Sequence, residues 1–160
     1  MALLVAGGAI VHFGNNKGGT AVTRHVTAAA IDGDTLRVGR HRYRLVGIDA
    51  PELDQTCRDE NGRPWACGGE ALARLSGLVG FGGVECKSSS RDRYGRPLAV
   101  CSSGSVPDIG EAMVRAGYAV SYMSWTYWLA ERDARAHKRG IWRGTFTSPQ
   151  AWRSGARDAG

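Results

Sequence analysis

The sequence has no hydrophobic run long enough to cross a membrane and no cysteine pair at zinc-finger spacing. A membrane-spanning helix needs about 20 apolar residues, whereas the apolar stretch at the N-terminus ends within residues 1–13. None of the four cysteines lies two to four residues from another, as structural zinc ligands usually do. No histidine stands at a spacing typical of metal ligands, and no internal repeat is visible. These absences exclude a zinc module and a repeat array.

Length and charge favour a single basic domain. The 160 residues suffice for one domain with its own core. A hydrophobic content of 42% and a charged content of 22% are ordinary for a soluble globular protein. The 21 Lys and Arg against 15 Asp and Glu give a net charge of +6. Such an excess favours a polyanionic partner, either nucleic acid or an anionic membrane surface.

The two ends of the chain differ in composition from the middle. We expect residues 1–20 to be an apolar segment and linker outside the fold, either disordered or the remnant of a targeting or anchor segment. The segment lacks a basic start and a small-residue cleavage site. The domain is predicted over residues 21–153, and residues 154–160 are predicted to be a disordered tail because they are small and polar.

The cysteines are even in number and favour two disulfides. Cys57 and Cys67 flank a loop rich in Gly, Asn and Pro, while Cys86 and Cys101 lie on two strand-like runs. We predict the pairs Cys57–Cys67 and Cys86–Cys101, with four reduced, buried thiols as the alternative. Disulfides imply an oxidising compartment, so we expect a secreted or periplasmic protein, and the apolar N-terminus leaves open an anchor to a membrane.

Hydrophobic periodicity predicts short strands interleaved with three helices. The predicted strands are 23–31, 35–38, 42–48, 84–87 and 97–101, the predicted helices are 69–78, 107–116 and 127–138, and residues 118–122 are expected to be extended. Five short strands with interposed helices predict an α+β fold, mainly a β-barrel, of the five-stranded OB type with three α-helices.

The stretch 44–52, which reads RLVGIDAPE, is the centre of the predicted site. Pro51 has no amide hydrogen and a fixed φ, so the strand must end near Ala50. Strict alternation would place Arg44 and Asp49 on opposite faces, but a bend or bulge near Gly47 would bring them together. A buried structural ion pair is the alternative for this stretch alone.

Several of these side chains suit phosphodiester chemistry. Asp34 follows a tight turn and Asp49 ends a strand predicted to lie nearby, so their carboxylates and a backbone carbonyl would suit Ca²⁺ or Mg²⁺. Glu52 could act as a base or orient a water molecule. Arg44 and Arg96 could bind a phosphate through two hydrogen bonds each. The alternative is that the aspartates are turn residues and the arginines are solvated.

Three segments together resemble the staphylococcal nuclease-like (thermonuclease) family. They are residues 31–36 (IDGDTL), 43–52 (YRLVGIDAPE) and 92–99 (DRYGRPLA), in the order and spacing of the family. Residues 111–117 (EAMVRAG) and 138–142 (KRGIW) are similar to two further family motifs. The resemblance covers about residues 23–143 and is to the secreted or membrane-associated, cysteine-containing bacterial type.

The resemblance implies a Ca²⁺-dependent endonuclease acting on DNA and RNA that leaves 3′-phosphate ends. It implies the following roles: Asp34, Asp49 and the Ala50 carbonyl as metal ligands, Glu52 with Arg44 and Arg96 as catalytic residues, and Arg93, Tyr94 and Tyr122 in substrate binding. Ala50 stands where the best-known member has threonine, and Arg93 where lysine is usual. The cysteines of the 57–67 loop are absent from that member.

We expect DNA and RNA substrates, preferably single-stranded or locally unpaired, no obligate protein partner and a monomer. The alternative function is a catalytically silent nucleic-acid-binding module of the tudor type, which kept the fold and lost catalysis. The carboxylates distinguish the two hypotheses, because a module that only binds nucleic acid has no need of Asp34, Asp49 and Glu52 together.

Overall fold

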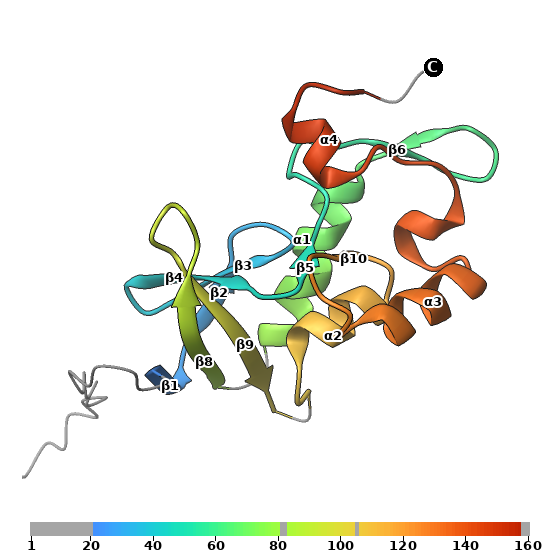
Figure 1. Cartoon of the computed structure of the whole chain (residues 1–160). Helices are drawn as coiled ribbons and strands as arrows, with labels where there is room; N and C mark the ends of the chain where they lie inside the picture. Colours follow the sequence, from blue (N-terminus) through green and yellow to red (C-terminus); the bar gives the residue numbers. More distant parts are fainter. Residues whose placement is uncertain (1–20, 81–82, 105, 158–160) are drawn as a thin grey trace, which may run out of the picture.

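The computed structural model describes residues 21–80, 83–104 and 106–157. The predictions for residues 1–20 and for the last three residues of the tail lie outside them. Figure 1 shows a curled sheet on one side of the molecule and the helices on the other, with the short strands β5 and β10 between them. The α+β class predicted from the sequence is confirmed. Among the described residues, no helix is both long and apolar enough to span a bilayer.

The bounds of the elements follow the predicted order closely. The strands are β1 (Ala21–Val26), β2 (Ala28–Ala30), β3 (Thr35–Val38), β4 (His41–Leu45), β5 (Ile48–Asp49), β6 (Cys57–Arg58), β7 (Pro64–Trp65), β8 (Val84–Arg91), β9 (Pro97–Ser103) and β10 (Val120–Ser121). The helices are α1 (Cys67–Val79), α2 (Ile109–Arg115), α3 (Trp128–Ala136), the 3₁₀ helix η1 (Gly140–Arg143) and α4 (Pro149–Arg153).

The main sheet has the strand order β1-β8-β9-β4-β3-β2. Within the part of the chain that the structure describes, β4 and β9 pair in parallel and the other neighbouring strands of this sheet pair antiparallel. The first and last strands of this order, β1 and β2, are separated by a single residue, Thr27. If β1 and β2 are counted as one interrupted strand, the sheet has five strands. This strand then pairs at both edges of the sheet, with β8 through β1 and with β3 through β2. The predicted OB-like arrangement is therefore present, although closure comes from this shared strand and not from a ladder between β1 and β2.

The expected strand over residues 42–48 is split into β4 and β5 by a bend at Gly47. The φ of Gly47 is +77°, a conformation that glycine adopts far more readily than other residues. A Cβ at this position would lie 3.1 Å from the ring of Tyr127, so packing also favours glycine. The strand resumes as β5, which pairs with β10. The predicted bend near Gly47 is confirmed, and it sets the direction of everything that follows up to Glu52.

The helices pack against the sheet through regular apolar faces. In α1 the residues Ala71, Leu75 and Val79 are buried, and their four-residue spacing places them on one side of the helix. The side chain of Asp108 caps α2 by accepting a hydrogen bond from the Glu111 amide. The predicted helices are all present. The short helix α4 is an addition, capped by Ser148 with Pro149 in its first turn.

Both predicted disulfides are present. Cys57 is bonded to Cys67, and Cys86 is bonded to Cys101, its direct partner across strands β8 and β9. The first disulfide joins the small β6–β7 hairpin, which the sequence did not predict, to the first residue of α1. It therefore fixes the start of α1 beside the segment that follows Glu52.

Candidate functional site

The turn before β3 places Asp34 against the end of β5. The Asp34 amide donates a hydrogen bond to Oδ1 of Asp32 at 3.0 Å, which stabilises the turn locally. A Cβ at Gly33 would lie 2.6 Å from the Cβ of Ala50, so only glycine allows this close packing. The Ala50 amide donates to Oδ2 of Asp34 at 3.2 Å. The two segments with the predicted metal ligands thus form one unit.

Arg44 joins the two aspartates. Its Nη1 lies 2.5 Å from Oδ1 of Asp34 and its Nη2 lies 2.8 Å from Oδ1 of Asp49. Both carboxylates are buried, with Asp34 4% and Asp49 1% exposed. The bend at Gly47 lets Arg44 and Asp49 meet in spite of their separation by five positions. The ion pair considered from the sequence is real, and it lies within the candidate site.

Burial dominates the electrostatics of Asp34. Removal of this carboxyl from water raises its pKa to about 7, while the positive charge of Arg44 acts in the opposite direction. The negative charges of Asp32 and Asp49 add to the increase. The site therefore favours an additional positive charge, either a proton or a cation, close to Asp34.

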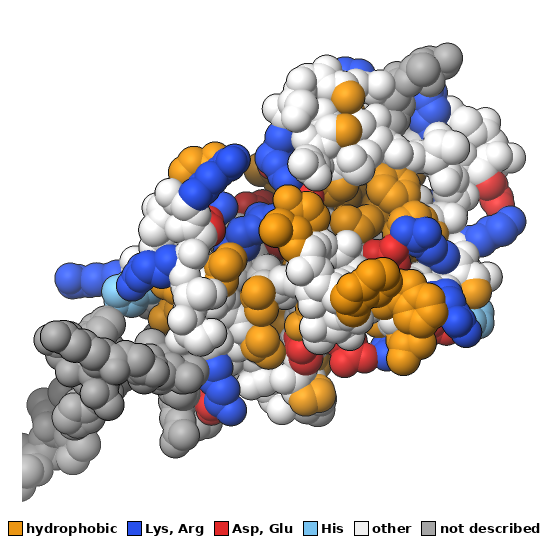
Figure 2. All heavy atoms as spheres, in the orientation of Figure 1, with side chains coloured by type: hydrophobic (Ala, Val, Ile, Leu, Met, Phe, Trp, Pro, Cys, Tyr) orange, Lys and Arg blue, Asp and Glu red, His pale blue; other side chains and the backbone are white. Residues whose placement is uncertain are grey.

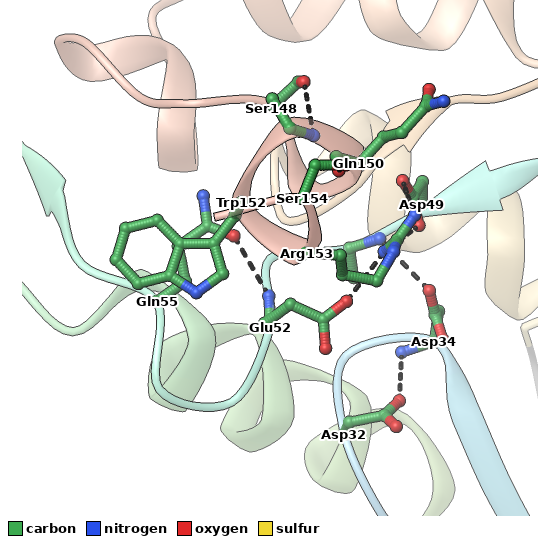
Figure 3. Close-up of polar contacts among 12 residues, drawn as sticks. Asp32, Asp34, Asp49, Glu52, Gln55, Ser148, Gln150, Trp152, Arg153 and Ser154 are labelled. Atoms are coloured by element: carbon green, nitrogen blue, oxygen red, sulfur yellow. Dashed lines mark hydrogen bonds and ion pairs between the residues drawn. The ribbon is translucent and has the colours of Figure 1, made fainter. Parts of the chain in front are cut away.

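Glu52 lies at the mouth of the site and is held from two sides (Figure 3). Its amide donates to Oε1 of the buried Gln55 at 3.1 Å. Its carboxylate accepts a hydrogen bond from Nη1 of Arg153 at 2.7 Å. Gly68 in the first turn of α1 packs against the Glu52 carbonyl so closely that a Cβ there would lie 1.8 Å from its oxygen. The backbone of Glu52 is therefore fixed while its side chain stays partly exposed.

The β8–β9 loop carries the second predicted phosphate-binding arginine. Asp92 organises this loop, because its carboxylate accepts from the amides of Tyr94 and Arg96 and from Nε of Arg96 at 2.7 Å. Tyr94 is 69% exposed, and its ring lies near the guanidinium groups of Arg93 and Arg96, at 4.8 Å and 5.7 Å. These contacts orient an exposed cationic and aromatic edge.

One open groove of about 1060 Å³ brings the predicted residues together. Eight of the nine predicted catalytic, metal-binding and substrate-binding residues line it: Asp34, Arg44, Ala50, Glu52, Arg93, Tyr94, Arg96 and Tyr122. The ninth, Asp49, is buried behind Arg44 and Arg153, with which it forms ion pairs. Figure 2 shows basic side chains over both the sheet and the helices of the face that it draws, with acidic side chains between them. The groove is open, and four arginines (Arg44, Arg93, Arg96 and Arg153) line it beside four carboxylates, so it offers guanidinium groups to the phosphates of an extended polyanion.

The donor set agrees with a hard cation. Asp34 and Asp49 offer carboxylate oxygens and Ala50 a backbone carbonyl, which are the ligand types that Ca²⁺ and Mg²⁺ prefer. Within the described residues no three His, Cys, Asp or Glu side chains are grouped so as to hold a metal ion. A cation here would therefore depend on the two aspartates, the backbone and water, and the residue roles stay predictions.

Three residues that organise the site were missed by the sequence analysis: Arg153, Gln55 and Asp92. Arg153 of α4 binds both oxygens of Asp49 and one of Glu52. The Ser148-Pro149 pair is a helix-start signal and could have revealed α4. Nothing in the sequence pointed Arg153 towards residues about a hundred positions earlier. Gln55 and Asp92 act through hydrogen bonds that no motif indicates.

Comparison with known proteins agrees with this geometry. Residues 42–144 match the family described as Staphylococcal nuclease homologue. The "Succinoglycan biosynthesis protein ExoI" of Rhizobium meliloti is 33% identical over 120 residues, which cover 72% of this chain and 63% of that protein. An "Uncharacterized endonuclease" of Escherichia coli O157:H7 is 34% identical over 120 residues, covering 70% of this chain and 72% of that protein.

A more distant relative is "Endonuclease YhcR" of Bacillus subtilis, which is 28% identical over 130 residues. The matched region covers 70% of this chain but only 11% of that protein. The family match covers the strand β4, the bend at Gly47, Glu52, the Arg96 loop and helices α1 to α3. It ends before α4. The chain belongs to the staphylococcal nuclease homologue family.

Proposed function

We propose that the protein is a calcium-dependent endonuclease that hydrolyses phosphodiester bonds of DNA and RNA and leaves 3′-phosphate ends. The observation that carries this proposal is the convergence of Asp34, Glu52, Arg44 and Arg96 on one open groove, with Asp49 buried behind Arg44. Endonuclease-named relatives of similar sequence support it. The net charge of +6 and the open groove support a nucleic-acid substrate, and we further propose that this substrate is single-stranded or locally unpaired and that the protein acts as a monomer.

The residues of the groove have different roles in the proposed hydrolysis. Arg44 and Arg96 are the cations available to the scissile phosphate, and guanidinium groups suit the charge that develops on its oxygens. Glu52 accepts a proton from the attacking water, whose oxygen forms the new bond to phosphorus. The bond from phosphorus to the 5′-oxygen breaks, and that oxygen takes up a proton from solvent water to give a 5′-hydroxyl.

A bound Ca²⁺ would supply further positive charge beside the phosphate and make water in the groove more acidic. Asp34, Asp49 and the Ala50 carbonyl would hold it. Arg93, Tyr94 and Tyr122 also line the groove, and we assign them to contacts with the phosphates and bases on either side of the cleaved bond. Tyr94 and Tyr122 offer rings for stacking.

Cleavage of plasmid DNA and of RNA with Ca²⁺, with Mg²⁺ and with EDTA tests the proposal. We expect cleavage with Ca²⁺ and none with EDTA. Glu52→Gln and Arg96→Ala should each lower the rate by about 100-fold or more, since each removes a group that acts in the transition state. Glu60→Gln and Arg63→Ala are matched controls, because both residues are exposed and lie outside the groove.

Two outcomes would contradict the proposal. Wild-type turnover by Glu52→Gln or Arg96→Ala would show that the site is wrongly assigned. Nucleic-acid binding without cleavage under all three conditions would favour the catalytically silent binding module instead.

We also propose that the protein works in an oxidising compartment, outside the cell or in a periplasm. The two disulfides support this. Thiol alkylation of the unreduced protein, followed by intact-mass measurement, tests it on protein purified from its native compartment. Four alkylated cysteines there would overturn it.

A further inference from the structure

Arg153 brings a positive charge into the candidate site from outside the family-matched region. The match ends at residue 144, whereas Arg153 is the last residue of α4. Figure 3 shows its side chain directed from α4 towards Asp49 and Glu52. The contact therefore joins a segment after the matched region to two carboxylates, Asp49 and Glu52, that lie inside it.

The guanidinium of Arg153 occupies the carboxylates that a cation would need. Nη1 and Nη2 lie 3.0 Å from the two oxygens of Asp49, and Nη1 lies 2.7 Å from Oε1 of Glu52. Oδ1 of Asp49 also accepts from Arg44, so both of its usual acceptor positions are filled. A divalent cation and Arg153 thus compete for the same oxygens.

Helix α4 is anchored so that Arg153 reaches the site. The indole Nε1 of Trp152, a mostly buried residue, donates to Asp54 at 3.2 Å. The side chain of Gln55 donates to the carbonyl of Thr147 at 2.7 Å, while its oxygen binds the Glu52 amide. The same glutamine therefore connects the α4 segment to Glu52. The Arg153 side chain itself is 39% exposed, so it can swing away while α4 stays in place.

The balance of charges at the site determines how the ion pairs of Arg153 affect the binding of a cation. When Asp34, Asp49 and Glu52 are all ionised, Arg44 and Arg153 together balance two of their three negative charges, which leaves little net attraction for a dication. Removing Arg153 would leave a deficit of two positive charges, which one Ca²⁺ fills. A ligand that must displace an internal competitor has a higher apparent Kd, and the increase is set by the fraction of molecules in which the competitor is already displaced.

We propose that Arg153 is an internal counter-ion that holds Asp49 and Glu52 in the metal-free protein and is displaced when a divalent cation binds. It thereby raises the cation concentration at which the site is filled. This inference rests on the proposed function, because it takes Asp49 to be a ligand of that cation.

Calorimetric titration with CaCl₂ in the absence of nucleic acid tests the competition directly. We expect Arg153→Gln to bind Ca²⁺ about tenfold more tightly than the wild type, the change that loss of one partly exposed ion-pair competitor allows. Arg153→Lys keeps the charge but loses the two-pronged contact, so its affinity should fall between the two. Arg157→Gln is the matched control, since Arg157 lies shortly after α4 but its guanidinium binds the carbonyls of Trp152 and Ala156 and the ring of Trp152, and it does not line the groove.

Thermal unfolding provides a second readout. In EDTA, Arg153→Gln should melt about 2–4 °C below the wild type, because it loses the ion pairs that hold the two carboxylates. In saturating Ca²⁺ the difference should vanish or reverse, because the wild type has then given up those pairs as well. Arg157→Gln should show the same shift in both conditions.

The outcomes separate this inference from the proposed function. Equal or weaker Ca²⁺ binding by Arg153→Gln, or an unchanged melting difference in Ca²⁺, would overturn the competition and leave the calcium nuclease intact. Absence of Ca²⁺ binding in both proteins would overturn the competition and the calcium dependence together. Binding by Arg153→Gln alone would support the competition in its strongest form.

Discussion

Replacement of Asp34 by Asn should change how the stability of the metal-free protein depends on pH. Burial raises the pKa of Asp34 from 3.8 to about 7, so the folded state holds this proton more tightly than the unfolded state does. Between these two pKa values the folded protein carries one proton more than the unfolded chain. Its free energy of unfolding therefore falls as the pH rises, whereas Asn in the same place has no proton to lose.

The size of the effect follows from the shift. A difference of about three pH units corresponds to about 4 kcal/mol. The contribution is fully present below about pH 4, declines as the pH rises and is lost above about pH 7. Relative to the wild type, Asp34→Asn should accordingly gain about 4 kcal/mol between pH 4 and pH 8. Effects of the substitution that do not depend on pH cancel in this comparison.

Urea denaturation of both proteins in EDTA, at several values between pH 4 and pH 8, measures this difference. A constant difference across the range, or a wild type that gains stability relative to the variant as the pH rises, would refute the reasoning. Repeating the series with saturating Ca²⁺ should remove or reverse the trend, since a bound cation favours the ionised carboxylate.

Two further substitutions test the backbone and the covalent framework. Gly47→Ala should destabilise the protein by roughly 2–3 kcal/mol, because the positive φ and the contact with Tyr127 both disfavour a Cβ. The control is Gly95→Ala, which should cost only about 1 kcal/mol, because Gly95 has a φ of +80° but no neighbour within 4 Å of the added Cβ. Equal losses of stability in urea denaturation would contradict this reasoning. Replacing Cys86 and Cys101 together by Ala should cost about 3 kcal/mol, the loop-closure value for a separation of 15 residues, and a double variant as stable as the wild type would show that the bond is dispensable.

Much of the candidate site could be predicted because its residues lie in short, local motifs. The turn before Thr35 and the proline after Ala50 fix Asp34 and Asp49 at the ends of strands, and such ends are marked by Gly, Asp and Pro. The alternation rule alone opposed a shared site for Arg44 and Asp49. Gly47 resolved the conflict, since an isolated glycine in a strand signals a bend.

What the sequence could not reveal depends on contacts between distant segments. The β6–β7 hairpin has only two residues in each strand, one of them Pro64, so no alternating pattern can form. Arg153 approaches Asp49 only because Trp152 and Gln55 fix α4 in place. Such placement follows from tertiary packing, which local periodicity does not report.

The parallel pairing of β4 with β9 has a consequence for the order of folding. Its register brings Arg44 beside Leu98, more than fifty positions further along the chain, whereas β3 with β4 and β8 with β9 are joined by short turns. Local hairpins close quickly, while pairings between distant residues form slowly because a large loop must be ordered first. Arg44 and Arg96 lie on the two sides of this pairing. The two arginines proposed to bind the phosphate are therefore expected to come together only at the slow step, and a chain with both hairpins formed but undocked would hold them apart.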